Sequence, residues 1–377
     1  MGERALLLVG AGHAHLEILR RLILEPLPGV ALTVVSLGEL QHYSGMVPGY
    51  LQGTYWEEEI AIRVPDLVRR AGGTFIAGRA VGLDPVRRGV RIEISPGEQR
   101  EIPYDFVSFA VGSNTAGVDA PGVREEAERV KPLERVVALF RRLWDLAGSQ
   151  ETVDAAVVGG GAAGVEVALA LAAVFERTCT AHQITILESG DEVLFSHPER
   201  VRRRARRVLE RRGITARTGQ RVVAVRSAEV ETENGERLPS RLTVWLTGAV
   251  AWPLFRDSGL PLDPRGFLLI DDALRSVEAP HIFAAGDCGT LASHPRTPKA
   301  GVYAVREAPV LWESLKAAIQ GGEPPRYEPQ EKFLSLLNTG DGRALLDYKG
   351  TVSHSRWAWR LKDRIDRRFM RRYQKLI

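Results

Sequence analysis

Two glycine-rich segments, each directly after a short apolar run, are the residues of this chain best suited to chemistry. The first is Gly10-x-Gly12 within LLLVGAGHAH, and the second is Gly159-x-Gly161-x-x-Gly164 within AAVVGGGAAG. A strand that turns into a helix through Gly-x-Gly presents backbone N–H groups and the positive end of the helix to a pyrophosphate. One such turn holds one dinucleotide, so two turns in one chain predict electron transfer between a nicotinamide and a flavin.

The second glycine motif is complete and is followed by an acid at the expected place. Glu188 ends the next predicted strand, 29 residues after Gly159. A carboxylate there accepts hydrogen bonds from the adenosine ribose hydroxyls. Ser189 follows instead of an arginine, which favours NADH over NADPH unless the arginines from Arg200 onward fold back over the ribose. The alternative is a glycine-rich turn without a ligand.

The first glycine motif departs from the pattern at two positions. His15 occupies the place of the third glycine, and Ser36 ends the next strand where an acid is expected. Glu39, three residues on, is a candidate substitute for that acid. Alone, the motif also allows a strand, turn and helix without a nucleotide. Gly286-Asp287, far along the chain, supports the dinucleotide interpretation.

Alternating strand and helix patterns predict an α/β chain in several units. Residues 4–9, 31–35, 154–158, 183–187 and 241–246 read as strands, and 14–24, 136–146, 165–175, 200–212 and 298–319 as helices. Residues 38–55 read as a long loop of the kind that carries function. Glycines and prolines at 321–325 mark a linker before a small C-terminal region.

Composition limits the alternatives. Only Cys179 and Cys288 occur, which argues against a disulfide framework and for a reducing, cytoplasmic compartment. No apolar run is long enough to predict a membrane-spanning helix. The eight histidines show no metal-ligand spacing, so we expect no metal. Eight arginines in 200–212, without interleaved aromatics, indicate a solvated helix face rather than nucleic-acid binding.

The basic character of the chain comes from its tail. The net charge is +4, and Arg356 to Ile377 holds nine Lys/Arg and two Asp, a local +7. Apolar residues recur there at helical spacing: Trp357, Leu361, Ile365, Phe369, Tyr373 and Leu376. Such a helix either lies peripherally on an anionic bilayer or packs on its own domain or on a second subunit of a homodimer.

The order of motifs resembles that of the two-dinucleotide flavoprotein reductases. After the first glycine turn come FAVGS (109–113), the second turn, VWLTGA (244–249), SGLPLDPRGFLLID (258–271) and APHIFAAGDC (279–288). The narrower resemblance is to type II NADH dehydrogenase-like proteins and to the reductase module fused to some selenide, water dikinases. It rests on GHAH (12–15), YSGMVPG (43–49), KAGVYAVRE (299–307) and RWAWRLKDRIDRRFM (356–370).

The resemblance implies two Rossmann-like domains, with an NAD domain inserted into a discontinuous FAD domain. The FAD domain would comprise 1–120 and 263–325, the NAD domain 121–262, and the C-terminal region 326–377. Residues implied for FAD are Gly10, Gly12, His13, His15, Ser36, Pro48, Ala110, Gly286, Asp287 and Lys299. Those for NADH are Gly159, Gly161, Gly164 and Glu188, and Gly112 and Gly248 would lie at the two crossings between domains.

The implied reaction is hydride transfer from nicotinamide to flavin, for which a protein supplies alignment and electrostatics. Glu166 would sit near the nicotinamide. Tyr43 would lie beside the isoalloxazine, and His13 would hold charge on the reduced flavin. Both Tyr43 and His13 are equally compatible with simple packing.

Departures from the family pattern keep the electron acceptor open. Neither cysteine is placed for a thiol relay, so a disulfide mechanism is not expected. Glutamines that accompany the quinone in type II NADH dehydrogenases are replaced by Val302 and Arg306. A quinone at the inner face of the membrane is the preferred acceptor. A protein or small molecule of selenium or sulfur metabolism, and a non-enzymatic binding module with a weakened FAD site, are the alternatives. For the two hypotheses that involve electron transfer, both glycine turns must open onto one cavity.

Overall fold

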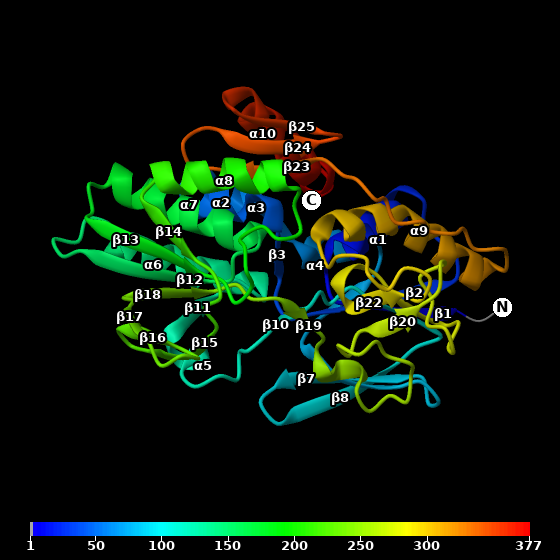
Figure 1. The fold of residues 1–377 in the computed structure, drawn as a ribbon. Helices are drawn as coiled ribbons and strands as arrows, with labels where there is room; N and C mark the ends of the chain where they lie inside the picture. The colour runs from blue at the N-terminus through cyan, green and yellow to red at the C-terminus, as the bar shows by residue number, and fades with distance from the viewer. Residues whose placement is uncertain (1–2) are drawn as a thin grey trace.

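A computed structural model describes residues 3–377. The chain forms two α/β halves side by side, with C-terminal strands and a last helix across the top (Figure 1). Each half is built on a five-stranded parallel sheet. Both faces of such a sheet are covered by other elements, so its strands are apolar along their length. The predicted α/β class is confirmed.

The sheet of the first half takes strands from both ends of the chain. Its order is β21-β9-β1-β2-β5. β21 follows the whole of the second half in sequence, as an inserted second domain requires. Helices α1 and α9 pack against each other beside this sheet. The bounds are β1 (Arg4–Val9), α1 (His13–Leu24), β2 (Val30–Ser36), β5 (Thr74–Ala77), β9 (Phe106–Phe109), β21 (Ile282–Ala284) and α9 (Gly301–Gln320).

The predicted loop at 38–55 is largely structured. Its backbone forms a strand, a short turn of helix at Ser44–Met46 and a helix, because β3 finds an antiparallel partner in β4. The bounds in this part are β3 (Leu40–His42), α2 (Val47–Leu51), α3 (Glu57–Ile60), β4 (Ala61–Arg63) and α4 (Val64–Arg70). A peripheral antiparallel sheet follows, of β6 (Arg79–Asp84), β7 (Gly89–Ser95) and β8 (Glu98–Pro103), and β20 (Leu268–Ile270) pairs with β22 (Gly289–Leu291).

The second half has the strand order β11-β18-β12-β13-β14. Its strands are β11 (Ala127–Arg129), β12 (Val153–Val158), β13 (His182–Leu187), β14 (Ile214–Arg217) and β18 (Leu242–Trp245). Its helices are α5 (Val123–Glu126), α6 (Val136–Leu146), α7 (Ala162–Arg177) and α8 (Glu199–Arg211), and β15 (Val222–Arg226), β16 (Glu229–Thr232) and β17 (Arg237–Pro239) form a small antiparallel sheet.

Two short strands join the halves where the chain crosses between them. β10 (Asn114–Thr115) and β19 (Ala249–Val250) pair in antiparallel fashion. Gly112 lies just before β10 with φ of +65°, and Gly248 directly precedes β19. Each crossing glycine therefore lies where the backbone leaves one half for the other.

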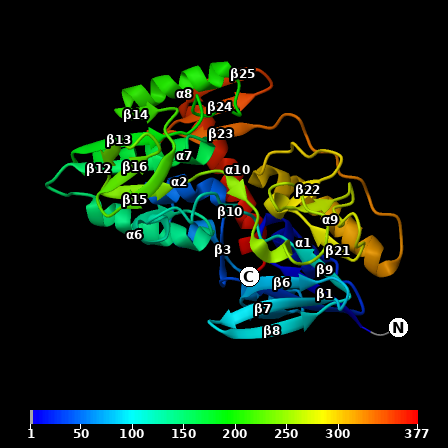
Figure 2. The same ribbon diagram turned by 60° about the horizontal axis from the view of Figure 1, so that its bottom comes forward.

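The C-terminal region is a hairpin-built sheet followed by one long helix. β23 (Ser335–Asn338), β24 (Ala344–Tyr348) and β25 (Thr351–Ser355) are antiparallel, and α10 spans Arg356–Gln374. The Ser355 hydroxyl caps this helix by accepting a hydrogen bond from the Ala358 N–H at 3.2 Å. Figure 2 shows α10, in red, running between the two halves.

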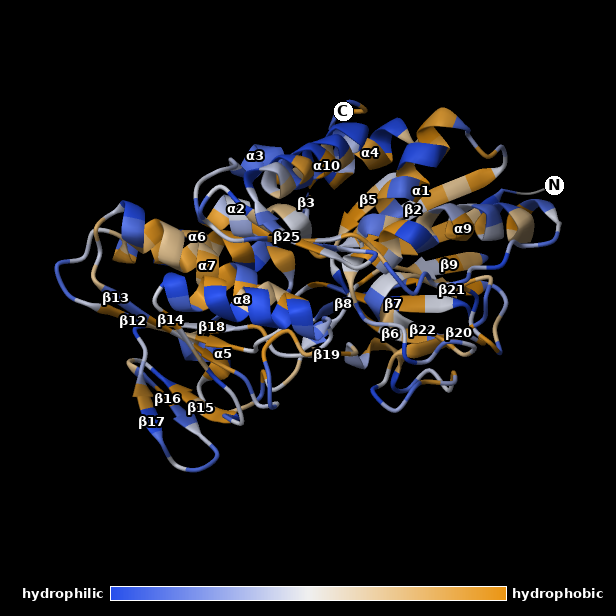
Figure 3. Ribbon diagram, turned by 45° about the horizontal axis from the view of Figure 1, so that its top comes forward, coloured by the Kyte–Doolittle hydropathy of each residue, from blue (hydrophilic) through white to orange (hydrophobic). Residues whose placement is uncertain are grey.

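Hydropathy follows this architecture. In Figure 3, the strands of both parallel sheets are mostly apolar, whereas α8 and α10 are largely hydrophilic. α7, at the centre of the second half, is buried on most of its sides. Across residues 3–377, none of the helices is both long and apolar enough to cross a membrane.

Candidate functional site

One cavity of about 2220 Å³ lies between the two halves and under the C-terminal region. Both glycine turns, Glu188 and Gly286-Asp287 open onto it. The requirement that the two turns share a cavity is therefore met. Its wall contains all but one of the predicted site residues: Gly10, Gly12, His13, Ser36, Tyr43, Pro48, Ala110, Gly112, Gly159, Gly161, Gly164, Glu166, Glu188, Gly248, Gly286, Asp287 and Lys299.

The first glycine turn is fixed by a close approach to the end of β9. Gly10 has φ of +86°, and a Cβ on either Gly10 or Gly12 would lie 2.5 Å from the Ala110 carbonyl oxygen. The Gly12 N–H donates to that same oxygen at 3.1 Å. Only glycine fits at both positions. The turn is therefore intact in spite of its altered third position.

His15 is a correction to the predicted FAD contacts. It is fully buried and does not line the cavity. Burial lowers the pKa of His15 to about 4, so the ring is neutral. Its Nδ1–H donates to the Gly10 carbonyl at 2.6 Å, and Nε2 lies 2.8 Å from the Ser108 hydroxyl, which donates to it. His15 thus braces the turn against β9 instead of contacting a cofactor.

The second glycine turn shows space where a pyrophosphate would lie. Gly159 has φ of +114° and abuts the Leu246 carbonyl, while a Cβ on Gly164 would collide with the Gly159 carbonyl. In contrast, a Cβ on Gly161 would meet no atom within 4 Å. Gly161 precedes the first residue of α7, so the helix N-terminus points at this space.

Glu188 is held at the end of β13 by backbone donors. Its carboxylate accepts hydrogen bonds from the Gly160 N–H at 2.6 Å and the Gly190 N–H at 2.7 Å. It lines the cavity beside Ser189. This geometry fits a pair of ribose hydroxyls.

The corresponding end of β2 has no such acid. Ser36 is buried and lines the cavity. Glu39 does not take the place of the missing acid, because it is half exposed, pairs with Arg63 at 3.0 Å and lies outside the cavity wall. The structure therefore corrects the suggestion that Glu39 substitutes.

Asp287 is the charged centre of the first half of the cavity. It accepts hydrogen bonds from the Ser113 hydroxyl at 2.7 Å and the Lys131 ammonium at 3.1 Å. Burial alone would raise the pKa of Asp287, but Lys131 and Ser113 outweigh it and lower that pKa. The carboxylate is therefore ionised and available to the hydroxyls of a ribityl chain.

Lys299 and Glu307 lie near Asp287 at the same end of the cavity. Lys299 lines the cavity, but its ammonium donates to the Gly289 carbonyl and, at 2.8 Å, to the Thr290 hydroxyl. Glu307, on α9, accepts a hydrogen bond from the Gly286 N–H at 2.5 Å and is almost fully buried. Burial raises the pKa of Glu307 to about 7. Glu307 thus holds the glycine turn that presents Asp287.

An aromatic group occupies the α10 side of the cavity. The Tyr43 ring stacks on Phe369 with centroids 4.4 Å apart, and the His13 ring lies 5.4 Å from Tyr43 and 5.5 Å from Phe369. Burial lowers the pKa of His13 to about 4. The imidazole is therefore neutral at pH 7. Within residues 3–377, nothing hydrogen-bonds to its ring nitrogens.

Buried polar residues from three parts of the chain meet next to this aromatic group. Glu166 of α7 accepts a hydrogen bond from the Asn338 N–H of β23 at 2.7 Å. Burial raises the pKa of Glu166 to about 7, in spite of nearby Lys362. Lys362 pairs with Asp366 at 2.8 Å and also donates to a backbone carbonyl of the first half, and Asp366 accepts from the Tyr43 hydroxyl at 3.2 Å.

The cysteines do not take part in this arrangement. Cys288 is buried, its thiol donates to the Phe109 and Ala285 carbonyls at 3.3 Å, and burial raises its pKa to about 11. Cys179 is exposed. Neither lines the cavity. A thiol relay has no basis in this geometry.

A family model described as pyridine nucleotide-disulphide oxidoreductase matches residues 4–310. The chain belongs to this family. The predicted oxidoreductase and its predicted cofactors, FAD and NADH, are confirmed at the level of the family. The two-site cavity fits these cofactors, because both glycine turns open onto it, Gly161 faces open space, and the acids Glu188 and Asp287 both lie at its wall.

Relatives agree in fold and class. The chain is 28% identical over 290 residues to demethylphylloquinone reductase NdbB of Synechocystis sp., covering 75% of this chain and 71% of the relative. It is 25% identical over 295 residues to a mitochondrial external alternative NAD(P)H-ubiquinone oxidoreductase B1 of Solanum tuberosum, covering 69% of this chain. The chain spans about half (51%) of that potato relative. NDH2 from Plasmodium falciparum, solved in complex with NADH, matches with a TM-score of 0.81 over 98% of both chains at 15% identity.

The sequence missed the partners of the predicted residues. Ser113, Lys131 and Glu307 support Asp287, and Asn338, Lys362 and Asp366 surround Glu166. The i,i+4 spacing of Lys362 and Asp366 on a predicted helix was a usable signal for an ion pair. Nothing in the sequence showed that this pair would be buried against the first half.

Proposed function

We propose that this chain accepts hydride from NADH onto bound FAD and passes the electrons to a quinone. The observation that supports this most strongly is the single cavity lined by both glycine turns, Glu188 and Asp287. When bound there, the flavin supplies the acceptance of hydride and the release of electrons. The protein holds the two dinucleotides in line and excludes water from the buried polar group around Glu166.

NADH is the proposed donor. Glu188 presents its carboxylate at the place proposed for the adenosine ribose, and Ser189, which follows it, carries no positive charge. The 2′-phosphate of NADPH would lie against that carboxylate, which disfavours NADPH. The arginines of α8 that could reverse this preference lie on the surface rather than over Glu188, apart from Arg200, which lines the cavity.

A quinone is favoured by the α10 side of the cavity. Tyr43, Phe369 and Ile365 line it, and Ile365 is 40% exposed, so this wall reaches the surface. An apolar, aromatic wall suits a flat hydrophobic ring. The named activities of the relatives include demethylphylloquinone and ubiquinone reduction.

Peripheral attachment to the inner face of the membrane through Arg356–Ile377 is part of the proposal. The structure shows that α10 packs on its own chain by Ala358, Lys362, Asp366, Met370 and Tyr373. Trp357 stays 63% exposed beside exposed arginines, which suits an anionic interface. Part of the apolar face that the periodicity predicts for α10 is therefore buried against the protein, and part is exposed to solvent.

The soluble alternative is a reductase of a protein or small molecule. It is favoured by Val302 and Arg306, which line the cavity in place of the glutamines of type II NADH dehydrogenases. The two are separated by reducing the FAD-loaded chain with NADH under nitrogen and then mixing it with quinones or with protein acceptors. Rapid recovery of absorbance near 450 nm with quinones supports the proposal, and recovery only with other acceptors refutes it.

A further inference from the structure

The arginines of α8 fall on two flanks with different surroundings. On one flank, Arg202 lies 3.0 Å from Glu192 and 2.7 Å from Glu199, and Arg206 lies 2.9 Å and 3.0 Å from the same two carboxylates. Arg203 also approaches Glu199, at 3.9 Å. On this flank three arginines share two carboxylates, so most of its charge is neutralised within the protein, and we call it the neutralised flank.

The other flank has no carboxylate partner. Its four members, spaced four, three and four residues apart, fall within about 60° around the helix at 100° per residue. We call them the arginine stripe: Arg200, Arg204, Arg207 and Arg211. Throughout the part of the chain that the structure describes, no acid lies within 4.0 Å of their guanidinium nitrogens. At about 1.5 Å per residue, the stripe is roughly 17 Å long.

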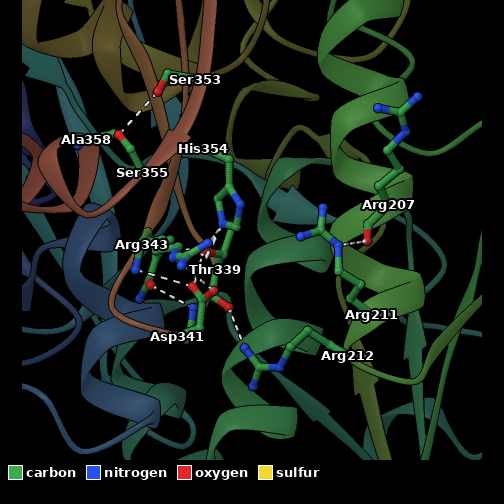
Figure 4. Close-up of polar contacts among 12 residues, drawn as sticks. Arg207, Arg211, Arg212, Thr339, Asp341, Arg343, Ser353, His354, Ser355 and Ala358 are labelled. Atoms are coloured by element: carbon green, nitrogen blue, oxygen red, sulfur yellow. Dashed lines mark hydrogen bonds and ion pairs between the residues drawn. The ribbon is translucent and has the colours of Figure 1, made fainter.

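Such a stripe opposes the stability of its own helix. Like charges at i,i+4 repel, and the other flank shows that the chain places glutamates where they neutralise arginines. Within the stripe, the Arg211 side chain donates only to the Arg207 carbonyl, at 3.1 Å, which leaves both charges uncompensated (Figure 4). A partner outside the chain would supply the missing negative charge.

A hairpin with as many acidic as basic residues lies beside the stripe. The β24–β25 hairpin packs beside α8, and the Arg200 guanidinium lies 3.5 Å from where a Cβ on Gly350 would be. Lys349 is exposed in the β24–β25 turn, and Arg343 is exposed in the preceding β23–β24 turn. Asp341 in that preceding turn is engaged locally, because it accepts from the Thr339 hydroxyl at 2.6 Å and the Arg343 N–H at 3.2 Å. Asp347 of β24 forms no ion pair with the stripe within residues 3–377, so the hairpin does not neutralise the stripe by direct contact.

Strands β24 and β25, which contact α8, also contact α10. β25 leads directly through Ser355 into this helix, where Arg356 and Arg360 are exposed and Trp357 is 63% exposed. Figure 3 looks onto a face in which both α8 and α10 are in view. A tryptophan beside several arginines is the composition of surfaces that bind the headgroup region of anionic bilayers.

We infer that the arginine stripe of α8 binds the phosphates of an anionic phospholipid surface, as a second contact besides α10. The inference rests on the proposed membrane attachment and extends it to the NAD-binding half. A bilayer is favoured over single-stranded nucleic acid because residues 199–212 hold no aromatic side chain for base stacking. It is favoured over an acidic protein by the exposed Trp357, which lies in the helix that packs on the same strands, β24 and β25, as α8 does.

The test uses the FAD-loaded full chain and vesicles of phosphatidylcholine with or without phosphatidylglycerol. Arg207→Gln/Arg211→Gln removes two charges from the stripe, and Arg203→Gln/Arg206→Gln removes two charges from the neutralised flank. The wild type should co-sediment only with vesicles that contain phosphatidylglycerol. Each basic residue near such a surface contributes about fivefold, so the stripe variant should bind at least tenfold more weakly and the control within about threefold of wild type.

Three outcomes overturn the inference. The first is equal weakening by both variants, which would show attraction by net charge alone. The second is a wild type that ignores anionic vesicles but is retained by polyglutamate, which would indicate an acidic polypeptide partner. The third is retention by single-stranded DNA without vesicle binding. Reduction of a water-soluble short-chain quinone by NADH is measured in parallel: if it fails while vesicle binding follows the stripe, the proposed acceptor is wrong and the surface assignment stands.

Discussion

At the scale of single residues, Asp287 is the acid on which flavin retention should depend most. It is ionised, mostly buried and lines the cavity beside the glycine turn that Glu307 holds. We expect Asp287→Ala to purify without yellow colour, because hydrogen bonds from ligand hydroxyls to a charged acceptor contribute about 1.5–3 kcal/mol each. The ratio of absorbance at 450 nm to 280 nm measures the loss.

Ser113→Ala provides the matched control for this prediction. It removes one neighbour of Asp287 but leaves the Lys131 ammonium and the carboxylate in place. This variant should keep most of its flavin. Full flavin content in Asp287→Ala would remove Asp287 from the FAD site.

Glu188 should determine the choice between the two nicotinamide dinucleotides. Its carboxylate is already positioned by the Gly160 and Gly190 N–H groups, so ribose hydroxyls gain a fixed, charged acceptor. Glu188→Arg should lower kcat/KM for NADH about 10- to 100-fold, which corresponds to one hydrogen bond to a charged group. It should also raise the relative use of NADPH. An unchanged NADH/NADPH ratio would mean that Glu188 does not contact the ribose.

Glu166 should make the stability of the chain depend on pH near neutrality. Its pKa is about 7 in the folded chain because burial disfavours the carboxylate, against an ordinary value of 4.5. Between these values, the folded state holds a proton that the unfolded state has lost, so stability falls as pH rises and the penalty is complete above about pH 7. The upper bound of this penalty is roughly 3.5 kcal/mol, from about 1.4 kcal/mol per pKa unit.

Glu166→Gln tests this sign directly. The amide side chain of this variant remains neutral at every pH and keeps an oxygen for the Asn338 N–H. The variant should match the wild type at pH 5 and melt at a higher temperature than the wild type at pH 8.5. A constant difference in Tm between the two pH values would show that Glu166 does not titrate in this range.

The sequence could predict site residues that belong to one local motif. It could not predict site residues that come from distant parts of the chain. Gly159, Gly164 and Glu188 follow from one strand, one turn and one helix, whose spacing is fixed by the chain. Lys131 reaches Asp287 across 156 positions, and Asn338 reaches Glu166 across 172. Such contacts depend on how whole domains pack, which local spacing does not record.

At the scale of elements, α10 contacts the first half through both members of an ion pair within the helix, because Lys362 donates to the Gly45 carbonyl and Asp366 accepts from the Tyr43 hydroxyl. Lys362 and Asp366 are both nearly buried and lie 2.8 Å apart. Removing one partner leaves the other charge buried and unpaired, at a cost of about 3–5 kcal/mol, whereas replacing both by apolar residues is often neutral or stabilising. We therefore expect Asp366→Leu and Lys362→Met each to loosen α10 more than the double variant does.

Amide hydrogen exchange of the segment that forms α10 is the appropriate measurement. Each single variant should speed exchange across the helix, while exchange in β1 and β12 stays unchanged. In the double variant, the exchange rate of α10 should be close to that of the wild type. If the double variant exchanges faster than either single variant, the pair is not buried as a unit in solution.

The long elements could be predicted from periodicity, and the short ones could not. β1 and α6 have the predicted bounds, because a strand or helix buried along one face repeats its pattern over enough residues. The sheet β23-β24-β25 was not predicted. Its strands have four or five residues each, and β25 is polar, so its only signature is pairing with β24. The same holds for β3 and β4.

At the scale of the whole molecule, the chain closes its first sheet only after the second half is complete. β21 pairs with β9, so the elements that carry Asp287 and the first glycine turn come together across the entire second half. The cavity between the halves is a product of this topology. The order of motifs predicted the insertion, whereas the position of the C-terminal region over the cavity became visible only in three dimensions.

A shared cavity with two separate dinucleotide sites should give two separable ligand effects on stability. A ligand that binds only the folded state stabilises it by about 2.7 kcal/mol at 100 times its Kd, which raises Tm by a few degrees in a chain of this size. FAD should raise the Tm of flavin-stripped protein, and NAD⁺ should raise it further. Glu188→Arg should abolish only the second shift and Asp287→Ala only the first, because the two acids lie at opposite glycine turns. Loss of both shifts in either variant, with circular dichroism unchanged, would mean that the two turns form one coupled site and that the assignment of one dinucleotide to each is wrong.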